Sequence, residues 1–322
     1  MPSTSRLLRI LRQWKTLLGT EASVGGEDPG RELWPVVATD GRQYFLKQLS
    51  PWRNLPLADE ARVLGWLSRR GIVVAEFLIT DDASVFGVDG EESFILMPRL
   101  DLDDLDSAET LEAEGVAGRA VAELHAGLAG YPWPVHSYTE QLSVSLRDEL
   151  LLPPDVADLF APRVGSITAG IDALPTQLVH GDLTPENVLL QKGGSVAGFI
   201  DFDHLPLAPR TWDVARYLSR RLRLRWRGGR VPDQDRARHI EPFLRGYQHS
   251  SPLTGAEIDA LPGLILAGNI IEANYGQQIS SGRLERRKLP DHDQTLADSI
   301  DAARWQLTHG QLVRDAVQAA TG

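Results

Sequence analysis

The residues best suited to chemistry lie in one short stretch, 180–187, which reads HGDLTPEN, and in Asp201 at the end of the next apolar run. A carboxylate can accept a proton from a hydroxyl group, and the side-chain oxygens of Asn and Asp are ligands that suit Mg²⁺. This order and spacing are typical of ATP-dependent phosphoryl transfer. We therefore predict that Asp182 accepts a proton from a substrate hydroxyl, and that Asn187 and Asp201 hold Mg²⁺ on ATP. The alternative interpretation is that Asp182 and Asn187 are turn residues and Asp201 caps a strand.

Two apolar runs around these residues, 188–190 and 196–200, predict an antiparallel hairpin, because the segment between them contains a Gly-Gly pair. Folding the chain about Gly194 would place Asn187 opposite Asp201. The two predicted metal ligands would then meet at one end of the hairpin.

The stretch HGDLTPEN resembles the catalytic loop of the aminoglycoside phosphotransferase and choline-kinase-like families. These families share the protein-kinase fold and carry His-Gly-Asp where protein kinases usually carry His-Arg-Asp. The resemblance implies that Asp182 is the catalytic base, that Asn187 and Asp201 are metal ligands, and that His180 braces the loop. The sequence WDVA around Asp213 resembles the family's Asp-Leu-Ala helix start, which implies that Asp213 holds the catalytic loop through backbone hydrogen bonds.

A further acidic residue, Asp203, follows Asp201 by two positions and points to the same side of an extended chain. Some small-molecule kinases of this type have a second acid there, so Asp203 is a candidate for a further metal or water ligand. The alternative is a capping or salt-bridge role, which is the commoner use of a single carboxylate.

The N-terminal third contains a candidate lysine–glutamate pair for the ATP phosphates. Alternation over residues 43–49 places Lys47 on a strand face between apolar neighbours, where an ammonium group needs an anion. A helix is predicted over residues 57–70, and its periodicity places Glu60 on the buried face. We predict a Lys47–Glu60 pair, as the resembling kinases have. The alternative for Lys47 is an edge-strand lysine that extends to solvent.

Other segments of this third match parts of a kinase small lobe. Asp40-Gly41 predicts a hairpin turn, and Pro35 in the preceding strand, residues 31–39, predicts an edge position or a bulge. Residues 23–30 occupy the place of the loop that covers the phosphates, although their glycine pattern is not specific.

Residues 93–100 read as a buried strand that runs into a linker. The resemblance implies that this is the hinge and that backbone groups near Met97 and Arg99 meet the adenine. The acidic run 101–106 is predicted to be a linker with a helix N-cap. A preference for a cationic substrate is the alternative.

Composition sets limits on the class of protein. With 322 residues, 42% hydrophobic and 24% charged, the chain is long enough for two lobes and ordinary for a globular protein. No apolar run reaches the roughly 18 residues of a membrane span. The absence of cysteine excludes disulfides and thiolate chemistry and fits a cytoplasmic location. A net charge of −11 argues against a nucleic acid partner.

The first residues, up to Gly19, are predicted to form an amphipathic helix. Its interspersed charges argue against a signal peptide. We expect it to pack on the small lobe, and a helix on a membrane surface is the alternative.

Only eleven residues separate Asp201 from Asp213, and no Ala-Pro-Glu motif occurs there. A protein kinase places its activation loop and peptide-docking surface in this interval. The phosphate acceptor is therefore predicted to be a small hydroxyl compound. A protein kinase or a non-catalytic regulator stays as a further alternative.

The acceptor site is expected in the C-terminal half. Residues 261–279 predict a helix that is apolar on most sides, so its polar residues Asn269 and Glu272 need partners and are candidates to line a pocket. Arginines at 216, 220, 223 and 227 share one helix face. A solvated helix surface is the favoured interpretation of these arginines, and a site for an anionic acceptor is the alternative.

Together these features predict an α+β, bilobal, protein-kinase-like fold, with an N-lobe of residues 1–98 and a C-lobe of residues 99–322. The predicted reaction moves the γ-phosphoryl group of ATP to a hydroxyl of a small molecule with Mg²⁺, and GTP stays open as a donor. An antibiotic or natural product is slightly favoured as acceptor, and an amino alcohol such as homoserine or choline, or a sugar, is the alternative. We expect a monomer or homodimer, with no nucleic acid or membrane partner.

Overall fold

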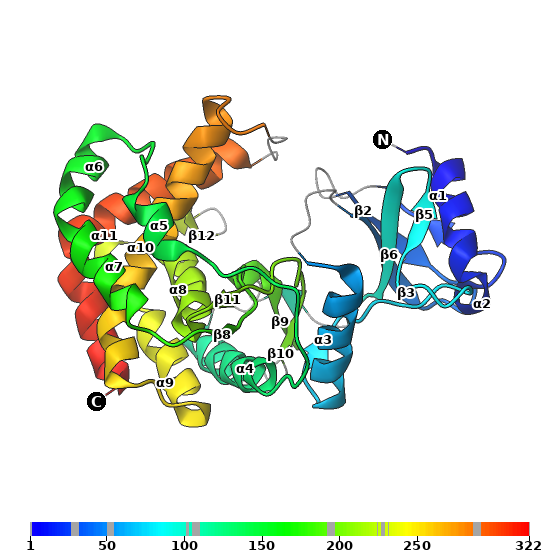
Figure 1. The fold of residues 1–322 in the computed structure, drawn as a ribbon, viewed down its shortest axis with the longest axis horizontal. Helices are drawn as coiled ribbons and strands as arrows, with labels where there is room; N and C mark the ends of the chain where they lie inside the picture. Colours follow the sequence, from blue (N-terminus) through cyan, green and yellow to red (C-terminus); the bar gives the residue numbers. More distant parts are fainter. Residues whose placement is uncertain are drawn as a thin grey trace. The chain divides into compact units, whose positions relative to one another are not determined.

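The computed structural model divides into two compact units (Figure 1). The first unit comprises Met1–Asp101 and Tyr131–Ser137, and the second comprises Leu102–Gly130 and Tyr138–Gly322. The predicted lobe boundary at residue 98 lies three residues before the end of the first stretch. The structure describes residues 2–26, 32–49, 55–100, 103–104, 110–191, 197–223, 225–226, 229–230, 232–285 and 291–321.

The first unit is built on a five-stranded antiparallel sheet, as expected for the small lobe. Its strands run in the spatial order β1 (Ser23–Val24), β2 (Leu33–Val37), β3 (Gln43–Gln48), β6 (Glu92–Pro98) and β5 (Gly87–Asp89), and the short β4 spans Val73–Val74. The predicted turn at Asp40-Gly41 connects β2 to β3, with hydrogen bonds from Ala38 N–H to the Arg42 carbonyl and from Gly41 N–H to the Ala38 carbonyl, both 2.9 Å. Of the predicted phosphate-covering loop, residues 27–30 lie outside the described part of the chain.

Pro35 does not mark an edge strand, because β2 lies between β1 and β3. The carbonyl of Pro35 accepts a hydrogen bond from Gly25 N–H at 2.8 Å, on the side of β1. In an antiparallel ladder the N–H and C=O of one residue face the same neighbour. The missing N–H of Pro35 therefore faces the end of the two-residue strand β1, and the ladder with β3 loses nothing.

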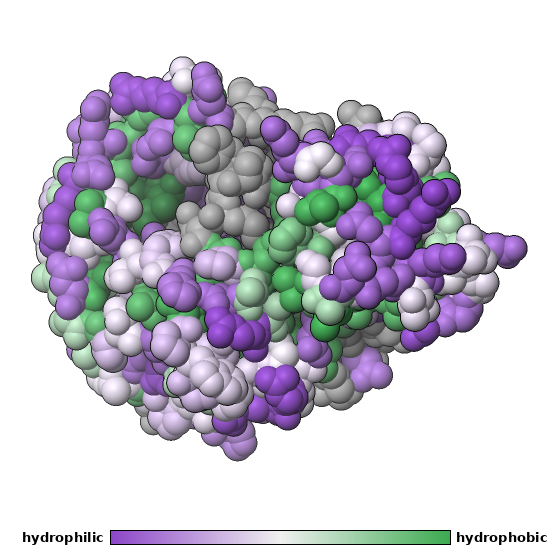
Figure 2. Space-filling model, turned by 45° about the vertical axis from the view of Figure 1, so that its right-hand side comes forward, coloured by the Kyte–Doolittle hydropathy of each residue, from purple (hydrophilic) through white to green (hydrophobic). Residues whose placement is uncertain are grey.

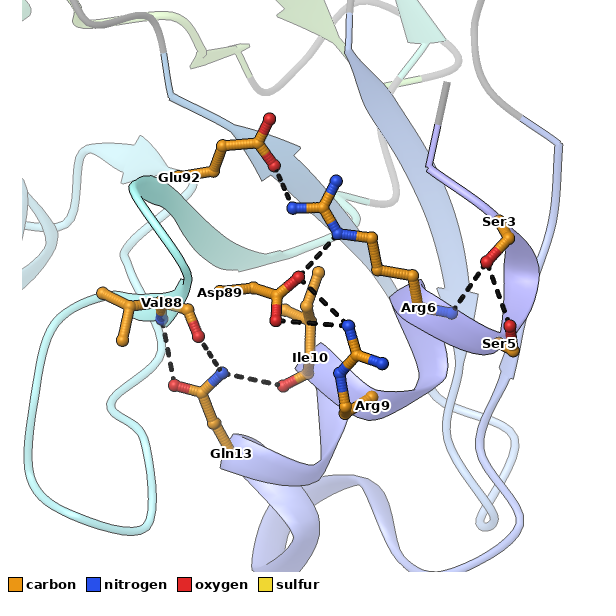
Figure 3. Close-up of polar contacts among 9 residues, drawn as sticks. All are labelled: Ser3, Ser5, Arg6, Arg9, Ile10, Gln13, Val88, Asp89 and Glu92. Atoms are coloured by element: carbon orange, nitrogen blue, oxygen red, sulfur yellow. Dashed lines mark hydrogen bonds and ion pairs between the residues drawn. The ribbon is translucent and has the colours of Figure 1, made fainter.

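The N-terminal helix packs on this sheet, which confirms the prediction. It consists of α1 (Thr4–Leu11), the 3₁₀ turn η1 (Arg12–Trp14) and α2 (Lys15–Leu18). Its apolar side chains, with Trp14 fully buried, join those of β2, β3 and β6 in one core. Leu8 of α1 is an exception among the apolar residues of this segment, because it is 39% exposed. Figure 3 shows the polar contacts that bind this segment to β5 and β6. Arg6 of α1 pairs with Asp89 and Glu92, and the side chain of Gln13 in η1 is hydrogen-bonded to both the N–H and the carbonyl of Val88.

The predicted Glu60 helix is α3 (Leu57–Arg69), and Glu60 is 1% exposed. Its neighbour Asp59 accepts hydrogen bonds from the backbone N–H of His136 at 3.0 Å and from the His136 ring at 2.8 Å. Tyr131 and Trp133 both make edge contacts with the Trp66 ring of α3. The segment 131–137 thus packs on α3, although it follows α4 in the chain.

The second unit is mainly helical, with small antiparallel sheets. Its principal helices are α4 (Leu111–Ala129), α5 (Leu142–Arg147), α6 (Pro154–Phe160), α7 (Val164–Asp172), α8 (Arg210–Arg221), α9 (Ile240–Ser250), α10 (Gly255–Ser280) and α11 (His292–Thr321), and its 3₁₀ turns are η3 (Ala161–Arg163), η4 (Pro185–Asn187) and η5 (Asp233–Asp235). Its strands are β7 (Asp103–Asp104), β8 (Gln177–Leu178), β9 (Val188–Leu190), β10 (Ala197–Phe199), β11 (Leu207–Ala208), β12 (Arg225–Trp226) and β13 (Gly229–Arg230). Strand β9 pairs with both β7 and β10, β8 pairs with β11, and β12 pairs with β13.

Helices α4 and α9 approach each other very closely, because glycines face the partner backbone. A Cβ atom on Gly118 would lie 2.0 Å from the Phe243 carbonyl oxygen, and one on Gly246 would lie 2.0 Å from the Gly115 carbonyl oxygen. Larger residues at these positions would force the two helices apart. This close pair carries two side chains that support the site described below.

The hairpin of β9 and β10 forms as predicted, but its register is shifted by one residue. The pairs are Val188 with Phe199, Leu189 with Gly198 and Leu190 with Ala197. The pairing is therefore centred between Gly193 and Gly194, not on Gly194, and Asn187 lies opposite Ile200 instead of Asp201. The connecting residues 192–196 are outside the described part of the chain.

No helix in the described ranges is long and apolar enough to cross a membrane. The face drawn in Figure 2 carries hydrophilic and hydrophobic residues that are interspersed.

Candidate active site

The catalytic loop is anchored on Asp213, which is fully buried near the start of α8. One carboxylate oxygen accepts the backbone N–H of His180 and the other accepts that of Gly181, both at 2.8 Å. The first oxygen also bonds His125 Nε2 at 3.0 Å, and His125 Nδ1 bonds the Tyr247 hydroxyl at 2.8 Å. His125 comes from α4 and Tyr247 from α9, so the close helix pair holds the anchor in place.

The loop turns sharply at Gly181, whose φ of 86° is in the left-handed region. A Cβ atom there would lie 2.4 Å from Pro206 Cδ and 2.9 Å from His204 Cβ. Both the backbone conformation and the space therefore require glycine. This explains in physical terms why no arginine stands before Asp182, as it would in most protein kinases.

His180 is fully buried and joins the loop to the end of strand β10. Its Nδ1 atom accepts the backbone N–H of Asp182 at 3.3 Å, so the proton is on Nε2, which donates to the Ile200 carbonyl at 2.9 Å. Its ring also lies against Phe202, with centroids 4.5 Å apart. These contacts suit the bracing role expected of His180.

Asn187 and Asp201 lie at neighbouring points of this framework. The Asn187 side-chain N–H donates to the Asp182 carbonyl at 2.8 Å, and the Asn187 carbonyl accepts Ile200 N–H at 3.2 Å. Because Nδ2 is used in this hydrogen bond, Oδ1 is the side-chain atom of Asn187 that could bind a metal ion. Asp201 is exposed and has a φ of 65°, which is unusual for a residue other than glycine and is common where function constrains the backbone.

This donor set fits Mg²⁺, which takes few protein oxygens and completes its shell with phosphate oxygens and water. Among the residues that the structure describes, no group of three or more His, Cys, Asp or Glu side chains could hold a metal by itself. A metal held by Asn187 and Asp201 would therefore depend on the nucleotide phosphates. Asp203, the further acidic candidate, is half-buried and makes polar contacts of its own.

Asp182 is held by an arginine from α8. Its Oδ1 atom lies 2.5 Å from Arg216 Nη2, and Arg216 Nη1 lies 2.9 Å from Glu272 Oε2 on α10. Burial alone would raise the pKa of Asp182, but Arg216 and His204 hold it below its usual value. Likewise, burial opposes ionisation of Glu272, but Arg216, Arg220 and Arg223 lower its pKa to about 2. Both carboxylates are ionised at neutral pH.

The favoured interpretation of the arginines as a solvated helix surface is wrong. Only 13% of the Arg216 side chain and 22% of the Arg220 side chain are exposed, and Arg223 is 8% exposed. Arg221 points the other way, into a buried cluster with Glu114 at 2.9 Å. Helix α8 is covered on both sides, and the spacing of the arginines could not reveal this. The side chain of Arg227 lies outside the described residues.

Two further residues near Asp182, Tyr138 and Glu140, were not predicted. Leu207 N–H bonds the Tyr138 carbonyl and Glu140 N–H bonds the Leu207 carbonyl, both at 2.9 Å, which brings Tyr138 and Glu140 beside the loop after β10. The Tyr138 hydroxyl lies 3.2 Å from His204 Nδ1. Burial raises the pKa of Glu140 against the positive influence of His204 and Arg216. No local pattern marks Tyr138 or Glu140, since only the fold brings them to the site.

Asn269, predicted as a possible acceptor contact together with Glu272, is fully buried on α10. Neither its Oδ1 nor its Nδ2 atom has a hydrogen-bond partner within the described part of the chain. Glu272, in contrast, is paired with Arg216. The predicted helix over 261–279 is present but longer, and it begins with a capping box between Thr254 and Glu257.

In the first unit, Lys47 is half-buried on β3, next to the fully buried Leu46. Lys47 and Glu60 each make polar contacts. The side of β3 that faces the core is that of Tyr44 and Leu46, so Lys47 shares the opposite, less buried side with Phe45. This is the side from which a lysine can reach a ligand.

The hinge segment has a defined backbone pattern. Leu49 N–H bonds the Ser93 carbonyl at 2.9 Å, and Arg99 N–H bonds the Gln43 carbonyl at 3.0 Å. Because hydrogen-bonded pairs alternate in an antiparallel ladder, Met97, which pairs with Phe45, also directs its backbone groups towards β3.

The backbone N–H and C=O groups of the even-numbered residues of β6 point away from β3. The hydrogen bond from Leu78 N–H to the Leu96 carbonyl, at 2.8 Å, shows this direction. The carbonyl of Pro98, the last residue of β6, faces the same way, because Pro98 pairs with Tyr44 at a position that is not hydrogen-bonded. The N–H of Arg99, in contrast, is already used by Gln43. The contact of adenine with backbone groups near Met97 and Arg99 stays a prediction.

The sequence over residues 34–253 matches the model of the family described as the phosphotransferase enzyme family. The chain belongs to that family. The match includes the strand of Lys47, the catalytic loop and helix α8. It supports an ATP-dependent small-molecule kinase, the class of enzyme that the catalytic loop predicted.

Among curated proteins, the chain is similar to a homoserine kinase of Zymomonas mobilis, with 32% identity over 117 residues, which cover 36% of this chain and 32% of that protein. It is also similar to a homoserine kinase of Neisseria meningitidis serogroup B, with 26% identity over 215 residues, which cover 63% of this chain and 66% of that protein. The matched part thus spans between one third and two thirds of these relatives.

Among solved structures, the microcompartment-associated aminopropanol kinase has a TM-score of 0.73 at 14% identity, with 99% of each chain covered. The amicoumacin kinase hAmiN has a TM-score of 0.70 at 16% identity, with 94% of this chain and 93% of that chain covered. At these identities the likeness concerns the fold, and it confirms the bilobal, kinase-like α+β architecture.

Proposed function

We propose that this protein transfers the γ-phosphoryl group of ATP to a hydroxyl group of a small molecule, with Asp182 as the base. The observation that carries this proposal is the fixed presentation of Asp182. The loop around it is held by two bonds to Asp213, by His180 and by the Asn187 amide. A rigid loop that presents one ionised carboxylate is what positional catalysis of phosphoryl transfer requires.

In the proposed reaction, the acceptor hydroxyl gives its proton to Asp182 while its oxygen bonds to the γ-phosphorus. The bond from that phosphorus to the β–γ bridging oxygen breaks, and ADP leaves. Asn187 and Asp201 would hold Mg²⁺, whose charge neutralises the phosphates. Lys47, held by Glu60, would position the phosphates. The donor is proposed to be ATP, since the amicoumacin kinase hAmiN was solved in complex with AMP-PNP.

A small metabolic acceptor, such as an amino alcohol or a hydroxy amino acid, is our first candidate. Two of the curated relatives with similar sequences are homoserine kinases, and one structural relative is an aminopropanol kinase. The arginines beside Asp182 also disfavour a polycationic acceptor, because like charges repel. These observations favour the metabolic alternative over the antibiotic acceptor that the sequence slightly favoured.

An antibiotic or other natural product is the second candidate, supported by the fold that the chain shares with amicoumacin kinase. The short interval between Asp201 and Asp213 argues against a peptide acceptor. It is filled by β11, which pairs with β8, and by the first turn of α8.

The test is the consumption of Mg²⁺-ATP against a panel of amino alcohols, hydroxy amino acids, sugars and hydroxylated antibiotics, with Asp182→Ala as the control. A productive acceptor should be phosphorylated by the wild type and lose about 10²–10⁴-fold in rate in the variant, the usual contribution of a general base. ATP affinity should stay the same. An equal loss of ATP affinity and rate would contradict the assigned role of Asp182.

A further inference from the structure

Three arginines beside the catalytic loop, of which Arg216 and Arg220 are half-buried and Arg223 is buried, are unequally paired. Arg216 contacts two carboxylates, at 2.5 and 2.9 Å, whereas Arg220 comes only within 3.9 Å of Glu186. Arg223, one turn further along, has no ion pair and no side-chain hydrogen bond with any residue that the structure describes, although it is only 8% exposed. A buried cation without a direct partner is costly, so this arrangement is suited to an additional anion.

The side-chain amide of Asn269, close to these arginines, also lacks hydrogen-bond partners. Asn269 is fully buried, and neither polar atom of its amide is hydrogen-bonded within the described residues. It lies one turn before Glu272 on α10, and Glu272 contacts Arg216. The adjacent Gly268 packs against Ser219 of α8, where a Cβ atom would lie 2.8 Å from the Ser219 hydroxyl. Asn269 thus belongs to the same layer between α8 and α10, with an unused donor that a ligand oxygen could accept.

The charges in this layer favour an anion over a cation. Burial lowers the pKa of Arg223 to about 9, and the neighbouring positive charge of Arg220 adds to this effect. Glu272 and Glu186 oppose it only partly. The protonated form of Arg223 is therefore destabilised. A bound carboxylate would stabilise this positive charge, whereas a bound ammonium group would destabilise it further.

We propose that Arg223 and Asn269 form a subsite for a carboxylate of the phosphate acceptor. This inference rests on the proposed function, because the same molecule would bind with its hydroxyl at Asp182 and its carboxylate at the subsite. Arg216 links the subsite to the catalytic carboxylate, since it pairs with both Asp182 and Glu272. The positive charge of Arg223 also stabilises the ionised Glu272. The acceptor is then a hydroxylated carboxylic acid, with a hydroxy amino acid as its simplest form.

Three acceptors that differ by one group test the proposal. L-homoserine carries a hydroxyl, an amine and a carboxylate, 3-amino-1-propanol lacks the carboxylate, and 4-hydroxybutyrate lacks the amine. With Mg²⁺-ATP, the two carboxylates should exceed 3-amino-1-propanol in kcat/KM by about 10-fold or more, the value of a charge-assisted hydrogen bond.

Arg223→Gln should lower kcat/KM for the two carboxylates by about 10- to 100-fold and leave that for 3-amino-1-propanol and the KM for ATP within about 2-fold. Asn269→Asp should act in the same direction, because it keeps the side-chain size and adds a repelling charge. This second variant decides the matter if Arg223→Gln does not fold. Arg245→Gln is the matched control, since it removes the same charge from a side chain that is 64% exposed.

Each outcome has a distinct meaning. If 3-amino-1-propanol is the better acceptor and Arg223→Gln does not change kcat/KM for the carboxylates, the subsite is refuted and the proposed reaction stands. If Arg223→Gln raises only the KM for ATP, the arginine binds nucleotide phosphate and the inference is overturned. If no acceptor is phosphorylated, titration calorimetry of L-homoserine and 3-amino-1-propanol decides. Binding of the carboxylate that is lost in the variants supports the subsite without the reaction, and equal or absent binding of both overturns it.

Discussion

The catalytic loop and the arginine layer lie next to each other, yet they satisfy their polar groups in opposite ways. Around Asp213, both carboxylate oxygens are hydrogen-bonded, and so are both ring nitrogens of His125. Between α8 and α10, in contrast, Nε of Arg216, Arg220 and Arg223 and both polar atoms of Asn269 have no hydrogen-bond partner among the described residues. A network in which every polar group is hydrogen-bonded fixes positions, whereas buried polar groups without partners are available to bind a ligand. The comparison therefore separates the region that holds the loop in place from the region that we propose to bind the acceptor.

The largest expected effect comes from breaking the satisfied side. Asp213→Ala would leave two backbone N–H groups and a buried histidine without their acceptor, and we expect a loss of about 3–5 kcal/mol in the free energy of unfolding. Chemical denaturation measures it. A loss below about 1 kcal/mol would show that Asp213 is not the anchor of the loop.

Gly181→Ala tests the same side through the backbone. The left-handed φ and the overlap with Pro206 should cost about 1–3 kcal/mol and displace Asp182 from its position. We expect kcat to fall by more than the KM for ATP rises. Gly41→Ala is a matched control for the backbone term, because its φ is 85° but no atom lies within 4 Å of the added Cβ. Equal effects of the two substitutions on kcat would contradict a positional role for Gly181.

Arg216 stands between the two sides and should control the protonation of the base. The pKa of Asp182 is lowered by Arg216, so the carboxylate is ionised well into the acid range. In Arg216→Gln this pKa should rise, and the acid limb of the pH–rate profile should move to higher pH. A profile measured from acid to neutral pH checks this. An unmoved acid limb would mean that a group other than Asp182 limits the rate.

The smallest expected effect lies on the unsatisfied side. Asn269→Leu replaces an unpaired buried amide by an apolar group of similar size, so the free energy of unfolding should change by less than about 1 kcal/mol or rise slightly. Thermal denaturation without ligand measures this change. A loss above about 2 kcal/mol would show that Asn269 already has a structural partner and would remove the contrast between the two regions.

The sequence predicted the satisfied region well, because its information is local. His180, Gly181 and Asp182 are consecutive, and Asp213 lies in the first turn of a helix with a recognisable pattern. The register of the hairpin could not be predicted to one residue, because it depends on how the loop between β9 and β10 closes. The inward direction of the arginines was missed for a related reason. A spacing of four and three residues describes one helix face, but only the packing of α10 against α8 determines whether that face meets water.

Tyr138 and Glu140 were beyond prediction because a backbone bridge to Leu207 brings them to the site. The Lys47–Glu60 pair stays a prediction, supported by the burial of Glu60 and by the open side of β3 on which Lys47 lies.

The segment 131–137 has a consequence for how this protein can be divided. Tyr131 and Trp133 complete the aromatic cluster on Trp66, and His136 satisfies the buried carboxylate of Asp59. The first unit is therefore not encoded by one continuous stretch. A fragment that ends near residue 101 would lack these contacts and expose an indole ring and an unpaired acid beside Glu60. Helix α3 therefore owes part of its packing to a segment that follows α4 in the chain, so the first unit folds completely only when residues beyond α4 are present.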